Sequence, residues 1–104
     1  MSSLHLEKID PYLSLFAFYS SLLTDTQKKY FEKYFSYNLS FQEIATLFKV
    51  SKNAVHDSIK VTVKLLDNYE KKLHLYKKYQ ARKKIYEQHS DCQFIAKLKE
   101  IDKI

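Results

Sequence analysis

The first predicted helix follows from an apolar run near the start of the chain. Asp10 and Pro11 are typical of an N-cap and of a first helical position, and residues 12–23 are apolar on nearly all sides of a helix. A helix that lacks a polar face is buried among other elements. We therefore expect this helix to lie in the protein core.

The second predicted helix carries a ridge of aromatic side chains. Thr24 and Gln27 have the spacing of a capping box, in which side chain and backbone bond reciprocally at a helix start. Aromatic residues then recur along one helical face, at Tyr30, Phe31, Tyr34 and Phe35. Such a stripe is more typical of a core than of a ligand site, so we expect the ridge to face the interior.

A short third helix and a long fourth one come next. Ser40 and Glu43 form another predicted capping box, which starts a helix over residues 41–48, and Ser51 caps the following helix. Apolar or small side chains then repeat every three or four residues, at Val55, Ile59, Thr62, Leu66, Tyr69, Leu73 and Tyr76. This pattern predicts an unbroken helix over 52–80, roughly 40 Å long at about 1.5 Å per residue.

The predicted long helix exceeds the width of a domain of this size. Its C-terminal half therefore needs a second copy of the chain, or the last segment folded back, to cover its apolar side. The residues expected at this oligomer or fold-back interface are Leu66, Tyr69, Leu73 and Tyr76. Ser90 and Asp91 are expected to start the last segment. Its weaker amphipathic stripe comprises Phe94, Ile95, Leu98 and Ile101. We predict a homodimer, with the fold-back contact as the alternative.

The composition favours an all-α fold. The chain contains no Gly and a single Pro, whereas tight β-hairpins need residues that tolerate positive φ. At 104 residues the chain has the size of one domain. We predict a single domain over 1–104 with about five helices. Its helix-turn-helix core spans 10–60, and a long-helix extension with a C-terminal helix spans 61–104.

Residues 41–60, FQEIATLFKVSKNAVHDSIK, fit the helix-turn-helix pattern. Ala45 stands where the two helices cross and only a small side chain fits, and residues 49–51 supply a three-residue turn. The interior positions that lock the two helices together are Ile44, Phe48, Val50, Val55 and Ile59. Lys49 stands where a Gly usually takes the left-handed conformation, at a cost on the order of 1 kcal/mol.

The positive charge is concentrated in one segment. The chain has a formal net charge of +6, and residues 51–84 contain ten Lys or Arg against three acids, a net of +7. The remainder has eight bases and nine acids, a net of −1. A localised basic segment is typical of a protein that meets a polyanion along one element, with a solvated lysine-rich helix face as the alternative.

The second helix of the motif is the candidate recognition helix. In DNA-binding examples its N-terminal residues contact base edges, and here these are Lys52, Asn53, His56 and Lys60, with Asp57 among them. The only Arg, Arg82, lies outside the motif. Lys is a flexible point charge and Asp57 repels phosphate, so this face favours contact with the nucleic-acid backbone over specific reading of bases.

A row of cations continues along the predicted long helix. It comprises Lys60, Lys64, Lys71, Lys78 and Arg82, which fall on one stripe at about 100° per residue, roughly opposite the Leu66 and Leu73 side. One face thus serves packing and the other serves anions or solvent. RNA helices and DNA backbones both suit such a stripe.

Several other classes of protein are disfavoured. The potential metal ligands are His5, His56, His74, His89 and Cys92, too scattered for a four-ligand zinc site. We expect no metal, no cofactor and no catalytic site, and Cys92 as a small apolar residue on the last helix. The start of the chain lacks a signal-peptide pattern, and no apolar run is long enough for a membrane span. We therefore predict a cytoplasmic protein without membrane insertion.

The sequence resembles the YlxM family, bacterial helix-turn-helix proteins associated with the signal recognition particle pathway. The resemblance covers roughly residues 13–80 and rests on FYSSLLTDTQKKYFEKYF, LSFQEIATLFKVSKNAVHDSIK and LLDNYEKKLHLY, in that order. The family is also similar to the C-terminal DNA-binding domain of sigma factors. Where the family usually has Arg-Gln-Ala-Val-Tyr, this chain reads Lys-Asn-Ala-Val-His over residues 52–56, which weakens the transfer of base-reading roles.

The resemblance implies an accessory or regulatory role near the GTPase and the RNA of the signal recognition particle. The alternatives are a DNA-binding transcriptional regulator that uses Lys52, Asn53, His56 and Lys60 in the major groove, and a protein-docking module without nucleic acid. Neither composition nor spacing indicates a link to protein targeting. That expectation comes from the likeness alone.

Overall fold

In the computed structural model, residues 11–103 are described and form helices joined by short connections. The α-helices are α2 (Pro11–Tyr19), α3 (Asp25–Phe31), α4 (Phe41–Phe48), α5 (Lys52–Leu73), α6 (Leu75–Gln88) and α7 (Gln93–Asp102). A 3₁₀ turn, η1 (Ser20–Leu22), follows α2, and a π-helical turn, η2 (Glu32–Ser36), follows α3. Within the described range there is no strand, and the all-α prediction is confirmed. Asp10, the expected cap of the first helix, lies outside that range.

The chain divides into two compact units, Met1–His74 and Leu75–Ile104. The first unit contains the helix-turn-helix and the second contains α6 and α7. The sequence had led us to expect one domain, with an extension starting near residue 61. The boundary between the two compact units lies after His74.

Three of the predicted helix starts, after Thr24, Ser40 and Ser51, are confirmed by their caps. Thr24 Oγ1 accepts from the backbone N–H of Gln27 at 3.2 Å, and the Gln27 side chain accepts from the N–H of Thr24 at 2.9 Å. Ser40 and Glu43 form the same reciprocal pair, at 3.0 and 2.8 Å. The Ser51 hydroxyl accepts from the third N–H of α5 at 3.0 Å. These bonds satisfy donors that a helix start otherwise leaves open.

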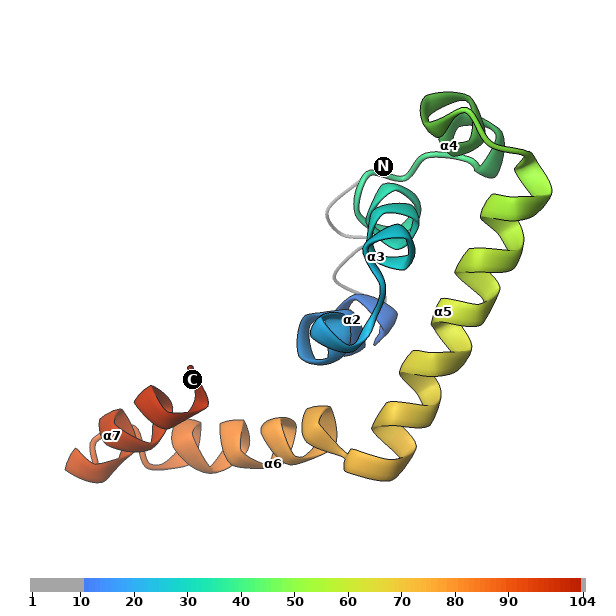
Figure 1. The fold of residues 1–104 in the computed structure, drawn as a ribbon. Coiled ribbons are helices and arrows are strands. Elements are labelled where there is room, and N and C mark those ends of the chain that lie inside the picture. The colour runs from blue at the N-terminus through green and yellow to red at the C-terminus, as the bar shows by residue number, and fades with distance from the viewer. Residues whose placement is uncertain (1–10, 104) are drawn as a thin grey trace. The chain divides into compact units, whose positions relative to one another are not determined.

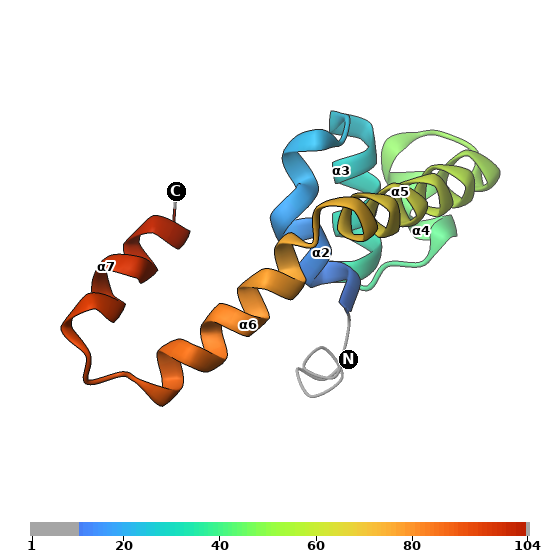
Figure 2. The same ribbon diagram turned by 90° about the horizontal axis from the view of Figure 1, so that it is seen from below.

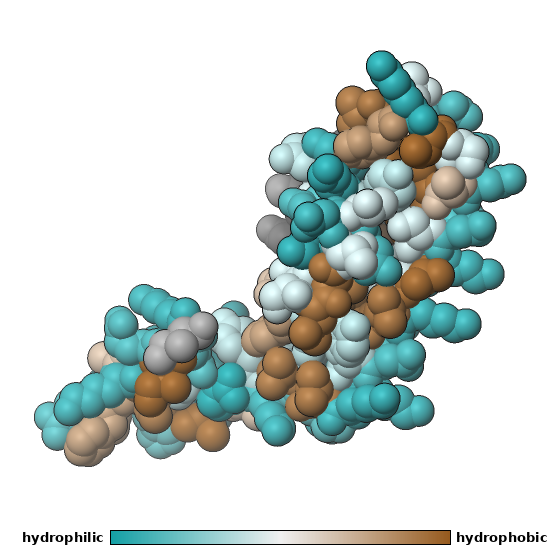
Figure 3. Space-filling view, in the orientation of Figure 1, coloured by the Kyte–Doolittle hydropathy of each residue, from teal (hydrophilic) through white to brown (hydrophobic). Residues whose placement is uncertain are grey.

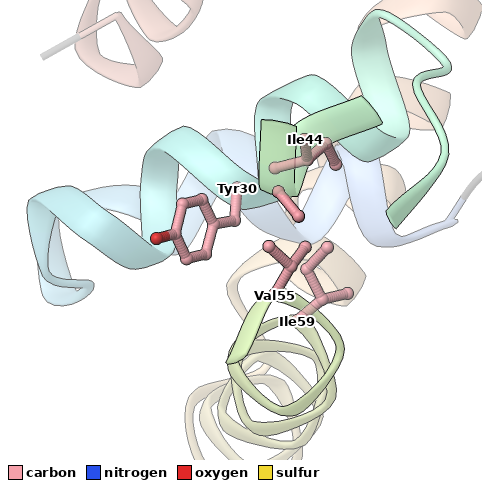
Figure 4. Packing of buried hydrophobic residues seen from close by; sticks show 5 residues of the cluster. Tyr30, Ile44, Val55 and Ile59 are labelled. Carbon is pink, nitrogen blue, oxygen red and sulfur yellow. The ribbon is translucent and has the colours of Figure 1, made fainter. Parts of the chain in front are cut away.

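In the first unit, α2, α3 and α4 all pack against α5 (Figures 1 and 2). Figure 4 shows Tyr30 of α3 and Ile44 of α4 pointing toward Val55 and Ile59 of α5. Over residues 11–74, the buried apolar residues are Leu15, Tyr19, Leu23, Tyr30, Phe31, Ile44, Ala45, Val55, Ile59 and Leu66. The core therefore forms on one side of α5, and the opposite side of that helix is left to solvent.

The predicted aromatic ridge faces this core. Tyr30 and Phe31 are buried, and Tyr34 and Phe35 are partly buried and packed against the same cluster. The ring of Phe31 stacks on that of Phe35 at 4.3 Å between centroids and on that of Phe16 from α2 at 4.5 Å. Stacked rings of this kind add to the free energy gained from burial, so the ridge joins α2 to α3.

The helix-turn-helix has the expected turn. Lys49 is left-handed, with φ 59° and ψ 46°, and the buried Ala45 accepts the backbone N–H of Val50 at 3.0 Å. The expected interior positions Ile44, Val55 and Ile59 are buried and Phe48 is partly buried. The prediction for Val50 was wrong, because its side chain is 37% exposed. Val50 contributes its backbone N–H to the turn rather than its side chain to the core.

The helix predicted over 52–80 ends at Leu73. His74 takes the left-handed conformation, with φ 55°, and its N–H bonds to the carbonyl of Glu70 at 2.8 Å. His is among the non-Gly residues more often found in that conformation. The next residue already begins α6. This interruption accounts for six α-helices in the described range where about five were expected.

Helix α2 covers the second half of α5. Leu66 is fully buried within the first unit, and the Tyr69 ring lies 5.8 Å from that of Tyr19. The Tyr19 hydroxyl donates to Glu70 at 2.7 Å. Leu73 is 44% exposed. Among the residues expected at an oligomer or fold-back interface, Leu66 is thus buried within the first unit, Tyr69 contacts α2, and Tyr76 lies beyond the break on α6.

The second unit is held by a polar cluster between its two helices. Asp102 of α7 accepts from the Tyr86 hydroxyl at 2.8 Å and pairs with the Arg82 guanidinium at 3.1 Å. Burial, with the carboxylate of Asp102 as a second cause, raises the pKa of the Tyr86 phenol above its usual 10.0. Tyr86 and Ile95 are buried in the described part of this unit.

The start of the last helix differs from the prediction. Helix α7 begins at Gln93 with Cys92 at the N-cap, not at Ser90 and Asp91. Cys92 is exposed rather than packed as an apolar residue on the helix. A Ser-Asp pair is a strong capping signal, yet residues 89–92 form a turn instead, in which Cys92 N–H bonds to the carbonyl of His89 at 2.9 Å.

Candidate nucleic-acid interface

The solvent side of α5 presents a row of lysines. Lys52, Lys60, Lys64 and Lys71 are all exposed. At about 100° per residue, the last three lie within about 40° of one another, roughly opposite the buried Val55 and Leu66 side. Figure 3 shows hydrophilic side chains projecting along the outer edge of this helix. The arrangement offers a continuous cationic edge to an anionic partner.

The start of α5 adds two polar side chains to this edge. Asn53 and His56 are exposed. The imidazole of His56 lies edge-on to the Phe41 ring, with centroids 5.2 Å apart at 79°, and its Nδ1 is 3.5 Å from Asp57 Oδ1. Phe41 begins α4, so the first helix of the motif positions a side chain on the second. The sequence analysis missed this contact, although both residues lie within the helix-turn-helix segment.

Two of the three acids of α5 are turned toward α2. Asp67 accepts from the Tyr12 hydroxyl at 3.2 Å, and Glu70 accepts from that of Tyr19 at 2.7 Å. Asp57 remains exposed beside His56. The hydroxyl bonds direct the carboxylates of Asp67 and Glu70 toward the α2 side of α5. The sequence gives the contribution of these acids to the net charge, but it carries no signal that shows which way their side chains point.

The predicted row does not continue as one helical stripe into α6. Lys78 is exposed on α6, and Arg82 is bound to Asp102. The left-handed conformation of His74 interrupts the angular register of 100° per residue. The structure therefore groups Lys60, Lys64 and Lys71 on one helix, and it places Lys78 in the other unit.

Other kinds of site find no support in the described residues. Between residues 11 and 103, no three His, Cys, Asp or Glu side chains come together to hold a metal ion. His5, one of the potential ligands, lies outside this range. None of the helices described has both the length and the hydropathy needed to cross a lipid bilayer.

Comparison with known proteins identifies relatives along almost the whole chain. Residues 6–104 match the family UPF0122, described as "Putative helix-turn-helix protein, YlxM / p13 like". A UPF0122 protein of Lactococcus lactis subsp. cremoris (strain MG1363) is 42% identical over 106 residues, covering 97% of this chain and 96% of the relative. A UPF0122 protein of Streptococcus suis (strain 98HAH33) is 46% identical over 88 residues, covering 85% and 78%.

The match and the geometry agree on the central motif. The family description names a helix-turn-helix, and in this structure α4, the turn at Lys49 and the start of α5 form one. Both relatives are covered over more than two thirds of their own length. The chain therefore belongs to the YlxM / p13-like helix-turn-helix family.

Proposed function

We propose that this protein is a regulatory, non-catalytic protein that binds nucleic acid through the exposed face of α5. The observation that carries the proposal is the row of Lys60, Lys64 and Lys71, exposed opposite the buried side of a helix-turn-helix. Lys52, Asn53 and His56 extend the surface at the start of the helix, and Lys78 adds a cation on α6.

Binding through this surface is mainly electrostatic. Each Lys that neutralises a phosphate releases counterions. On B-DNA, the logarithm of the binding constant therefore falls by about 0.9 per phosphate contact for each tenfold rise in salt concentration. Lysine ammonium groups position a phosphate backbone without a fixed bidentate geometry. The expected mode is therefore backbone contact by Lys60, Lys64 and Lys71, with strong salt dependence.

We propose in addition that the nucleic acid is the RNA of the signal recognition particle and that the protein acts in the cytoplasm as an accessory of that pathway, its GTPase being the second candidate partner. The support is the resemblance carried by residues 13–80. An RNA duplex is recognised largely by shape and backbone, and a lysine row suits that mode.

The test is a titration of the full chain against the particle RNA and against its GTPase at several salt concentrations. We expect RNA binding at low salt. A plot of the logarithm of the binding constant against the logarithm of salt concentration should become less steep in Lys64→Ala. Its slope should decrease by roughly 0.7 to 0.9, the value for one phosphate contact. Lys29→Ala, a change at an exposed lysine of α3, is the matched control. Absence of binding to both partners at low salt would contradict the pathway assignment.

A DNA-binding transcriptional regulator is the second candidate. The observation that favours it is the position of Asn53 and His56 on the first turns of α5, with the His56 ring held against Phe41. On this hypothesis His56→Ala reduces preference among DNA sequences, whereas Lys64→Ala weakens binding to all sequences alike. If selection from random DNA enriches no motif, this second function is excluded.

We also propose that the protein works as a homodimer. Leu66 is buried within the first unit and Tyr69 lies against Tyr19 of α2, so we expect the dimer contact on other parts of the chain.

A further inference from the structure

The two helices of the second unit form a hairpin with two different faces. Helix α6 turns Tyr86 toward α7, and α7 turns Ile95 and Asp102 toward α6. A hollow of about 380 Å³ opens on one side of this contact. Its lining residues are Tyr79, Lys83, Tyr86, Glu87, Lys99, Asp102 and Lys103. This side of the hairpin therefore carries three lysines and two carboxylates.

The opposite side of the hairpin carries a ridge of exposed apolar side chains. At about 100° per residue, Phe94, Leu98 and Ile101 fall within roughly 60° of one another on α7, on the side away from Lys99 and Lys103. By the same count, Ile85 of α6 points away from Lys83 and so lies on the same side as this ridge. The exposed fractions of Ile85, Phe94, Leu98 and Ile101 are 53%, 57%, 43% and 61%. Figure 3 shows hydrophobic side chains at the surface of this unit.

We propose that this apolar face binds a second copy of the chain through an antiparallel α7–α7 contact. The ridge is self-complementary about Leu98. When two α7 helices run antiparallel, Leu98 meets Leu98 of the partner subunit, and Phe94 meets Ile101 of the partner subunit. An isologous contact requires this kind of pairing, in which one patch matches itself after a two-fold rotation. The two hairpins then form a four-helix arrangement with the apolar faces inside.

The charges beside the ridge fit the same pairing. Lys97 flanks the ridge, and its ammonium lies 5.9 Å from the Phe94 ring centroid. Glu100 lies on the same flank and in its own chain meets Lys103 at 3.7 Å, with both side chains 75% exposed. In the antiparallel dimer Lys97 approaches Glu100 of the partner subunit, and the two-fold axis repeats this opposite-charge pair. The flanking charges therefore set register and orientation, as they do beside coiled-coil seams.

The experiment measures molar mass by light scattering during gel filtration, with nuclease-treated full-length protein. We expect a mass twice the 12.5 kDa of the chain at high micromolar concentration. Leu98→Glu should give the monomer mass with unchanged helical circular dichroism, since Leu98 is 43% exposed. The matched control is Leu22→Glu, at a leucine of the first unit that is 53% exposed, which should remain dimeric.

A charge exchange identifies the pairing itself. Lys97→Glu and Glu100→Lys each place like charges opposite one another and should raise the dimer dissociation constant several-fold. The double variant restores opposite charges and should return the constant to near that of the native chain. A monomeric native protein, a dimeric Leu98→Glu variant, or a double variant no better than the single ones would overturn the proposal.

These measurements contain no nucleic acid, so their result is independent of the proposed function. A binding surface for an anionic bilayer would behave differently, because Lys97→Glu would weaken it and Glu100→Lys would strengthen it. Pelleting of the variants with vesicles of anionic phospholipid distinguishes membrane binding from dimerisation. Vesicle binding that follows this charge order, together with a monomeric native chain, would contradict the proposed dimer.

Discussion

The two units of this chain are stabilised in different ways. In the first unit, α2, α3 and α4 bury apolar side chains against one side of α5, and Tyr19, Phe31, Ile44, Val55 and Leu66 are among its largest fully buried residues. In the described part of the second unit, Tyr86 and Ile95 are the buried residues, and the pairing of α6 with α7 centres on one carboxylate, that of Asp102. Burial specifies the first unit, and a small polar cluster specifies the second.

The comparison extends to the two left-handed residues that end helices. Lys49 and His74 have nearly the same backbone angles, φ 59° and 55°. After Lys49 the chain enters a helix that packs against the preceding one, with Ile44 and Val55 both buried. His74 is followed directly by α6, which belongs to the other unit. The same local conformation thus ends both helices, and at Lys49 buried apolar side chains accompany it on both of the flanking helices.

The largest expected effect is the loss of a fully buried side chain in the first unit. Leu66→Ala should lower the free energy of unfolding by about 2–5 kcal/mol, because it removes apolar contacts of a fully buried side chain and leaves a cavity in the first unit. Urea denaturation followed by circular dichroism measures the change. The control is Val61→Ala, at an exposed position of the same helix, which should cost much less. Equal losses for the two variants would contradict the full burial of Leu66.

A smaller, opposite effect is expected at the turn of the helix-turn-helix. Lys49→Gly should raise the free energy of unfolding by up to about 1 kcal/mol, because Gly adopts the left-handed conformation without the steric cost of a Cβ. Lys49→Ala keeps that Cβ and removes the charge, so it should not stabilise the protein. Thermal unfolding of both variants distinguishes the effect of backbone conformation on stability from the effect of removing the lysine charge. A stabilised Lys49→Ala variant would assign the effect to charge instead.

The smallest expected effect is a pH dependence of the second unit. The pKa of Tyr86 is raised in the folded state, so its contribution to stability is complete below about pH 10 and is lost as the pH rises through the folded value. As the pH rises above about 10, the hydrogen exchange of the α7 amides should therefore accelerate more than the intrinsic exchange rate of unprotected amides does. Tyr86→Phe should abolish that excess, whereas Tyr37→Phe, at an exposed tyrosine, should leave it.

The sequence alone determined the local structure of the first unit. The caps at Thr24, Ser40 and Ser51 were predictable because each depends on residues only three positions apart. The turn at Lys49 and the small residue Ala45 followed from the helix-turn-helix spacing. The aromatic ridge and the cationic side of α5 followed from helical periodicity, since a period of 3.6 residues fixes which side chains share a face.

Only the tertiary structure decided which partner covers each face. The apolar repeat from Leu66 to Tyr76 was compatible with a second chain, a folded-back segment or a neighbouring helix, and periodicity cannot distinguish these. The structure buries Leu66 within the first unit and places Tyr69 against Tyr19 of α2, over a sequence separation of about fifty residues. The break at His74 was hidden for a related reason. No Gly or Pro marks it, and a His in the left-handed conformation carries no local signal, because its cost of about 1–2 kcal/mol is offset by contacts elsewhere in the fold.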